Sequence, residues 1–171
     1  MASNFLYTLV HKLSNMHKNE KLIGMLNDLI RINNDRFEGY KNLLAEKNVI
    51  DNDIRLLVFN MADQSRANTS ALITEVIKLR TADVTGASFS ASIYRPNMGL
   101  KKSVSTGDRH SILESCKMRE EIIQKAYYDA LSLAAEIPDA VLNLISDQKR
   151  EMKSVNNMIN IYRHTPTAVA A

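Results

Sequence analysis

The chain has 171 residues, 45% of them hydrophobic and 24% charged, which suits one soluble globular domain with a substantial core. Its net charge of +3 is too small to indicate nucleic acid by itself, and no run of about 18 apolar residues predicts a membrane span. One cysteine, Cys116, excludes an internal disulfide and favours a reducing, cytoplasmic location. Five glycines and three prolines leave few helix breakers, so long helices are expected.

A short additional helix is predicted over residues 1–18, which we call the N-terminal extension. Phe5, Leu9, Leu13 and Met16 recur every three or four residues and form an apolar stripe. Such a helix would dock on the bundle, pair with a second subunit or touch a membrane surface. Membrane-binding helices usually carry a larger apolar face and more cations. We therefore expect a homo-oligomer, with a dimer favoured.

The first two long helices are predicted over residues 22–46 and 52–80. Asn19 lies near the start of the first, and Asp51 or Asp53 opens the second. Each helix carries an apolar stripe at helical spacing. Polar residues interrupt these stripes at positions that should face the core, among them Asn33, Gln64 and Asn68.

The segment 81–107 is rich in small and polar residues and is too long for an ordinary loop. It suits the long crossover that some four-helix bundles use between their second and third helices. The third and fourth helices are predicted over 108–135 and from Pro138 to 163. The whole bundle then spans residues 19–164, and a flexible tail covers 165–171.

The two predicted hairpins look like copies of each other. Asp63-Gln64 and Asp147-Gln148 occupy similar places in the second and fourth helices, and Tyr40 and Tyr127 occupy similar places in the first and third. This organisation is that of a ferritin-like four-helix bundle, which usually holds two metal ions. The predicted fold is therefore all-α and ferritin-like.

Asn33 and Glu120 each lie seven residues before one of these tyrosines, near the middle of their helices. We therefore predict a buried polar layer made of Asn33, Gln64, Glu120, Gln148, Tyr40 and Tyr127. A buried polar group without a partner costs about 1–3 kcal/mol, so such a layer should satisfy its own hydrogen bonds. The carboxyl group of Glu120 would pair with a cation such as Arg36 or Arg66, or burial would raise its pKa. The alternative is a partly hydrated bundle edge.

A glutamate seven residues before a tyrosine resembles a metal ligand of rubrerythrin-like proteins. A di-iron or di-manganese site also needs a Glu-x-x-His motif on each of two helices, and the sequence contains none. The four histidines lie in the extension or at helix ends: His11, His17, His110 and His164. No metal or other cofactor is therefore expected, and Glu120 with Glu121 would hold iron or manganese if any were bound.

Several motifs in order resemble a bacterial ferritin-like four-helix-bundle family of unknown function, over about residues 20–163. They are residues 26–40, Asp63-Gln64-Ser65-Arg66, Ile93-Tyr94-Arg95, Gly107-Asp108-Arg109 and Gln124-Lys125-Ala126-Tyr127. The resemblance implies a bundle sometimes tied to bacterial stress responses, with no established reaction and a degenerate metal site.

These observations favour a non-enzymatic protein that acts by self-assembly or binding. One alternative is a metal-dependent oxidase or peroxidase with an atypical carboxylate site. Another is a module that binds a small ligand or nucleic acid. Nucleic acid is not favoured, because Lys101-Lys102 with Arg95 and Arg109 lack interleaved aromatic residues.

Overall fold

The computed structural model describes residues 2–46, 51–82 and 108–165. In this part of the chain there are four α-helices, one short 3-10 helix and no strand, which confirms the prediction of an all-α bundle. The helices are α1 (Ala2–Ala45), α2 (Asn52–Ala82), α3 (Arg109–Leu131) and α4 (Asp139–His164), and η1 (Ala134–Glu136) lies between α3 and α4.

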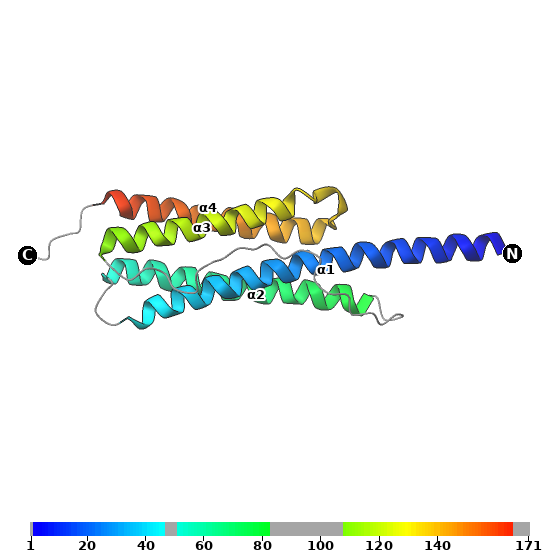
Figure 1. Cartoon of the computed structure of the whole chain (residues 1–171), viewed down its shortest axis with the longest axis horizontal. Helices are drawn as coiled ribbons and strands as arrows, with labels where there is room; N and C mark the ends of the chain where they lie inside the picture. The colour runs from blue at the N-terminus through cyan, green and yellow to red at the C-terminus, as the bar shows by residue number, and fades with distance from the viewer. Residues whose placement is uncertain (1, 47–50, 83–107, 166–171) are drawn as a thin grey trace, which may run out of the picture.

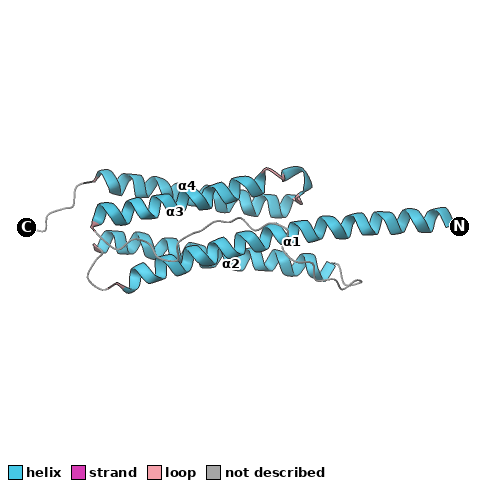
Figure 2. Ribbon diagram, viewed as in Figure 1, coloured by secondary structure: helices cyan, strands magenta, loops and turns pink. Residues whose placement is uncertain are grey.

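The helices form two antiparallel pairs that pack on each other (Figures 1 and 2). α1 packs along α2 and α3 packs along α4, while α1 also contacts α3 and α2 contacts α4. α2 ends and α3 begins at opposite ends of the bundle, so these two helices run in the same direction (Figure 1). The predicted crossover lies outside the described residues from residue 83 onward.

The prediction of a separate helix in the N-terminal extension is wrong. α1 runs without interruption from Ala2 to Ala45, and its first turns project beyond the end of the bundle (Figure 1). The reason is local: no glycine or proline occurs before Gly24, and Asn19 in a helix interior costs only a fraction of a kcal/mol. A residue that can cap a helix does not have to start one.

The other helix boundaries lie close to the predicted ones. Asp108 caps α3, since its side chain accepts a 2.8 Å hydrogen bond from the backbone N–H of Ser111. That bond lowers the pKa of Asp108. α3 ends at Leu131 rather than near 135, because η1 and Pro138 turn the chain into α4.

A partly exposed ion-pair cluster joins the starts of α2 and α3. Arg109 bonds Asp51 at 2.8 Å and Asp53 at 2.7 Å. The hydrogen bond from Arg109 is the main reason why the pKa of Asp53 is lowered.

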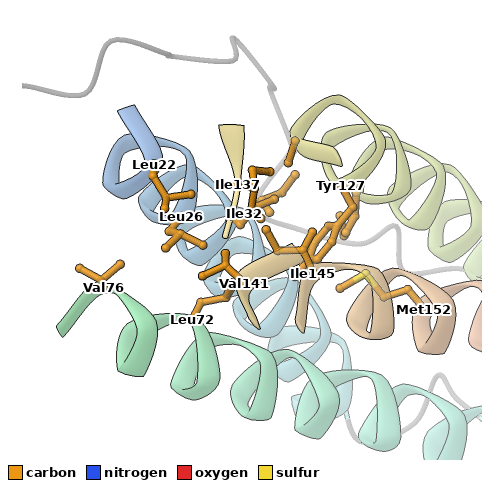
Figure 3. Packing of buried hydrophobic residues seen from close by; sticks show 13 residues of the cluster. Leu22, Leu26, Ile32, Leu72, Val76, Tyr127, Ile137, Val141, Ile145 and Met152 are labelled. Carbon is orange, nitrogen blue, oxygen red and sulfur yellow. The ribbon is translucent and has the colours of Figure 1, made fainter. Parts of the chain in front are cut away.

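The core consists of two apolar clusters, one toward each end of the bundle. The first is drawn in Figure 3 and includes Leu22, Leu26, Leu72, Val141 and Ile145. The second includes Leu43, Ile54, Met61, Leu113 and Ile159. Along every helix, the residues of one cluster are separated from those of the other by buried or partly buried polar side chains.

Candidate functional site

Polar side chains where the two clusters meet, two of them tyrosines that belong to the clusters, form what we call the polar centre. α1 contributes three of its members, α2 three, α3 two and α4 one. They are Asn33, Arg36, Tyr40, Gln64, Ser65, Asn68, Glu120, Tyr127 and Gln148. All of them are buried except Gln64, which is partly exposed at the edge.

One half of the polar centre is charged. The guanidinium of Arg36 donates to both carboxylate oxygens of Glu120, from Nε at 2.8 Å and from Nη2 at 3.0 Å. Tyr40 donates its hydroxyl proton to Oε1 of Glu120 at 2.6 Å. The remaining Arg36 donors reach Ser65 Oγ and Gln64 Oε1, each at 2.9 Å. Every charged atom of the pair therefore has a partner, although both side chains are 0% exposed.

The electrostatics of this half raise the pKa values of Arg36 and Tyr40. Burial, the largest single cause, lowers the pKa of Arg36, but Glu120 together with Tyr40 and Tyr127 raises it by more, so the net shift is upward. The pKa of Tyr40 is raised well above its ordinary value, first by burial and then by the charge of Glu120. Removing one partner of a buried pair leaves an uncompensated charge, which typically costs about 3–5 kcal/mol.

The other half is neutral and links all four helices. Asn33 Nδ2 donates to the hydroxyl of Tyr127 at 2.7 Å and to the carbonyl of Leu29 at 2.8 Å. Tyr127 in turn donates to Gln148 Oε1 at 2.8 Å, and Gln148 Nε2 donates to the carbonyl of Asn68 at 3.3 Å. Burial is the main reason why the pKa of Tyr127 is raised.

The hydrogen bonds of the two tyrosines follow the repeat in the sequence. Tyr40 bonds Glu120, which lies seven residues before the other tyrosine, and Tyr127 bonds Asn33, which lies seven residues before Tyr40. The tyrosine of each hairpin thus bonds the residue that lies seven positions before the tyrosine of the other hairpin.

One ion pair breaks this equivalence. By the same alignment the counterpart of Glu120 is Asn33 and the counterpart of Arg36 is Ile123, so only one copy of each charged residue is present. The acid and the base come from different hairpins and neutralise each other at the centre of the bundle.

Of the two cations that the sequence offered to Glu120, the structure selects Arg36. Arg66 is exposed and lies over the ring of Phe37, 5.9 Å from its centroid. Sequence reasoning left Ser65 out of the polar layer, although it follows Gln64 directly.

Arg119 was also missed. Its guanidinium lies against Gly39 so closely that a Cβ there would come within 2.7 Å, and it donates to the carbonyl of Asp35 at 3.2 Å. A glycine inside a helix marks a close approach of this kind, and Gly39 was the available signal.

The donor set around Glu120 does not fit a metal ion. Both carboxylate oxygens face donors of Arg36 and Tyr40, and Glu121 is exposed beside Lys117. Among the described residues, no group of three or more histidine, cysteine or acidic side chains is placed to hold a metal. Cys116 is buried, and burial followed by the charge of Glu120 raises the pKa of its thiol to about 12.

A broad groove lies between α1 and α2, with a volume of about 740 Å³. Its lining includes Phe37, Asp63, Arg66 and Ile73. In the described ranges, no helix is both long enough and apolar enough to cross a membrane.

Comparison with known proteins gives one match, a family model described as a domain of unknown function (DUF2383), over residues 21–133. No curated protein and no solved structure matches the chain. The matched range contains every member of the polar centre except Gln148. The prediction of a family of unknown function is thereby confirmed, and the chain belongs to the DUF2383 family.

Proposed function

We propose that this chain is a non-enzymatic, ferritin-like helical bundle that acts by assembly, and that its N-terminal extension binds a second copy. The observation that carries the proposal is the continuation of α1 beyond the bundle (Figure 1). Ser14, His17 and Lys18 there are exposed, and Met16 of the apolar stripe is partly exposed. A helix in water gains most of its stability by packing an apolar face, and the sequence supplies one in the stripe from Phe5 to Met16.

The interior supports the same function. The groups that would carry chemistry, Glu120, Tyr40 and Cys116, are buried and occupied by neighbours or held neutral. In this proposal they hold the two hairpins in register. The resemblance to a bacterial, stress-linked family supports a cytoplasmic protein whose assembly, rather than a reaction, is its activity.

The test is the mass of full-length variants in sedimentation equilibrium. Leu9→Glu with Leu13→Glu places two charges on the stripe and should weaken association. The matched control, Ser14→Glu with Lys18→Gln, makes the same change in net charge on the opposite side of the helix and should behave as the wild type. Equal masses for both double variants would overturn the role of the extension.

The alternative of a metal-dependent oxidase has its own test. Protein prepared without chelator should carry no stoichiometric iron or manganese, because Glu120 faces Arg36 rather than an open position. Metal that is present in the wild type and lost in Glu120→Ala would replace the assembly proposal by the oxidase. Salt-dependent retention on DNA would instead favour the nucleic-acid alternative.

A further inference from the structure

The outward face of α2 carries large apolar side chains in a regular pattern. Seven exposed residues follow each other at alternating spacings of three and four, which we call the α2 seam. They are Leu56, Phe59, Asp63, Arg66, Ser70, Ile73 and Ile77. The four apolar members are exposed by 61%, 56%, 42% and 55%. This spacing is that of a coiled-coil seam, in which one helix packs along another.

The internal repeat supplies a comparison, because each α2 residue has an α4 counterpart 84 positions later (148 − 64 = 84). The corresponding α4 positions are exposed too. Four pairs are identical: Asp63 and Asp147, Arg66 and Arg150, Ser70 and Ser154, Ile77 and Ile161. Three differ: Leu56 and Ala140, Phe59 and Asn143, Ile73 and Asn157. The face of α2 therefore carries four large apolar side chains at these positions, where its α4 counterpart carries only Ile161.

The order of side chains along the seam is nearly the same when it is read backwards. Two apolar residues lie at each end, and the charged and small residues lie between them. We propose that the α2 seam docks on the α2 seam of a second copy in the antiparallel direction. Leu56 then lies opposite the partner's Ile77, and Phe59 lies opposite the partner's Ile73.

The charges of the seam suit this arrangement. In the antiparallel alignment, the two Arg66 residues lie opposite each other, about 1.5 Å apart along the axis, and each lies about 6 Å along the axis from the partner's Asp63. A long arginine side chain spans that distance, so each Arg66 extends toward the partner's Asp63 and away from the other Arg66. The charges of the two Asp63 and the two Arg66 side chains sum to zero. Within α4 the equivalent Asp147 and Arg150 bond each other at 2.9 Å, whereas Arg66 lies over the ring of Phe37 at the edge of the seam. The groove beside Phe37, between α1 and α2, lets the partner helix settle against α1 as well.

The size of the seam sets the expected strength. From Leu56 to Ile77 it is about 32 Å long, and a helix about 11 Å wide covers on the order of 350 Å² of it. Stable interfaces bury about 800 Å² on each partner, so the contact is weak and depends on concentration. It is independent of the N-terminal extension and adds a second surface to the proposed assembly.

The first experiment replaces Phe59 and Ile73 by asparagine, the residue of their α4 counterparts, and measures sedimentation equilibrium. Association should weaken by about tenfold or more, because two large apolar side chains are lost from the contact. Met158→Asn with Ile161→Asn removes exposed apolar surface from α4 and should leave association unchanged. Equal association in both double variants would overturn the proposal.

The extension variants make the two surfaces separable. Leu9→Glu with Leu13→Glu should leave the α2 contact intact, and Phe59→Asn with Ile73→Asn should leave the extension contact intact. Only the fourfold variant should be monomeric at all concentrations. If the extension variant alone is monomeric, the proposed α2 contact is wrong and the proposed function stands. If the α2 variant alone is monomeric, the extension contact is wrong and the α2 contact stands.

A cross-linking experiment tests the antiparallel direction. Ala67→Cys places two thiols about 1.5 Å apart along the axis in the proposed dimer, so a short thiol cross-linker should join them. Ile77→Cys places its thiols about 32 Å apart, so it should not cross-link to itself, but it should cross-link to Leu56→Cys. Glu151→Cys, the α4 counterpart of Ala67, is the exposed control, and native Cys116 is buried. Self-cross-linking of Ile77→Cys would overturn the antiparallel arrangement.

Discussion

The polar centre and the α2 seam are opposite departures from the rule that apolar residues lie inside and polar residues outside. Inside, the charges of Arg36 and Glu120 are buried, but they satisfy each other together with Tyr40. Outside, Phe59 and Ile73 are exposed, and burial against another helix would remove their apolar surface from water. The interior groups already have partners within the chain, whereas the exposed apolar side chains would be buried by the second copy that we propose. Interior changes should therefore alter stability, and seam changes should alter association.

The largest effect on stability is expected from Glu120→Ala. It leaves the guanidinium of Arg36 buried without its counter-charge, so the free energy of unfolding should fall by about 3–5 kcal/mol. Replacing both partners, with Arg36→Met and Glu120→Leu, should cost less than Glu120→Ala alone. Urea unfolding followed by far-UV circular dichroism measures both. A loss below about 1 kcal/mol in Glu120→Ala would mean that the pair does not hold the hairpins together.

A smaller loss is expected from Tyr127→Phe. The variant removes the hydroxyl that joins Asn33 to Gln148 and leaves a buried amide oxygen without its donor, which costs about 1–3 kcal/mol. Tyr128→Phe is the control, because the neighbouring ring is exposed and lies beside Lys149. Equal urea midpoints for the two variants would argue against a stabilising hydrogen-bond connection from Asn33 through Tyr127 to Gln148.

High pH should destabilise the fold through the same interior groups. Burial is the first cause of the raised pKa values of Tyr40, Tyr127 and Cys116, so the unfolded chain releases these protons at lower pH than the folded one. Their stabilising contribution is complete below the unfolded pKa values, about 8.5 for cysteine and 10 for tyrosine. It declines as pH rises from there toward the folded values, by up to about 1.4 kcal/mol per pH unit for each ionising group.

The measurement is the urea midpoint from pH 7 to pH 10.5. Cys116→Ala should be less stable at every pH, because it leaves a small cavity, but its stability should fall less steeply between about pH 9 and 10. Phe59→Asn with Ile73→Asn should keep the wild-type slope. An unchanged slope in Cys116→Ala would show that the thiol ionises equally in both states.

The smallest effect is expected from Arg150→Ala on the outer face of α4. Its ion pair with Asp147 is well exposed, and such pairs contribute between about 0 and 1 kcal/mol. Neither stability nor association should change measurably. A clear change in association would place an interface on α4 and contradict the proposal that α2 carries the contact.

The helical periodicity was sufficient to predict the four long helices, apart from the start of α1, and to place Asn33, Glu120 and Gln148 on inward faces. It could not choose between Arg36 and Arg66 as the partner of Glu120, because that choice depends on how far α1 and α3 rotate toward each other. It also could not show that Asn19 lies inside a helix, since the same residue type starts helices elsewhere.

The α2 seam was missed for a related reason. α2 carries two apolar stripes, one with Leu57 and Met61 and one with Phe59 and Ile73, and the prediction followed only the first, on which Gln64 lies. The structure buries the first stripe and exposes the second.

The most direct test of the account is the mass of the wild-type protein in sedimentation equilibrium from about 1 μM to about 1 mM. We expect the mass to rise with concentration above the 19.3 kDa of one chain, because the exposed surfaces of α1 and α2 associate. A mass of 19.3 kDa at every concentration would contradict the claim that the exterior of this protein is completed by a second copy.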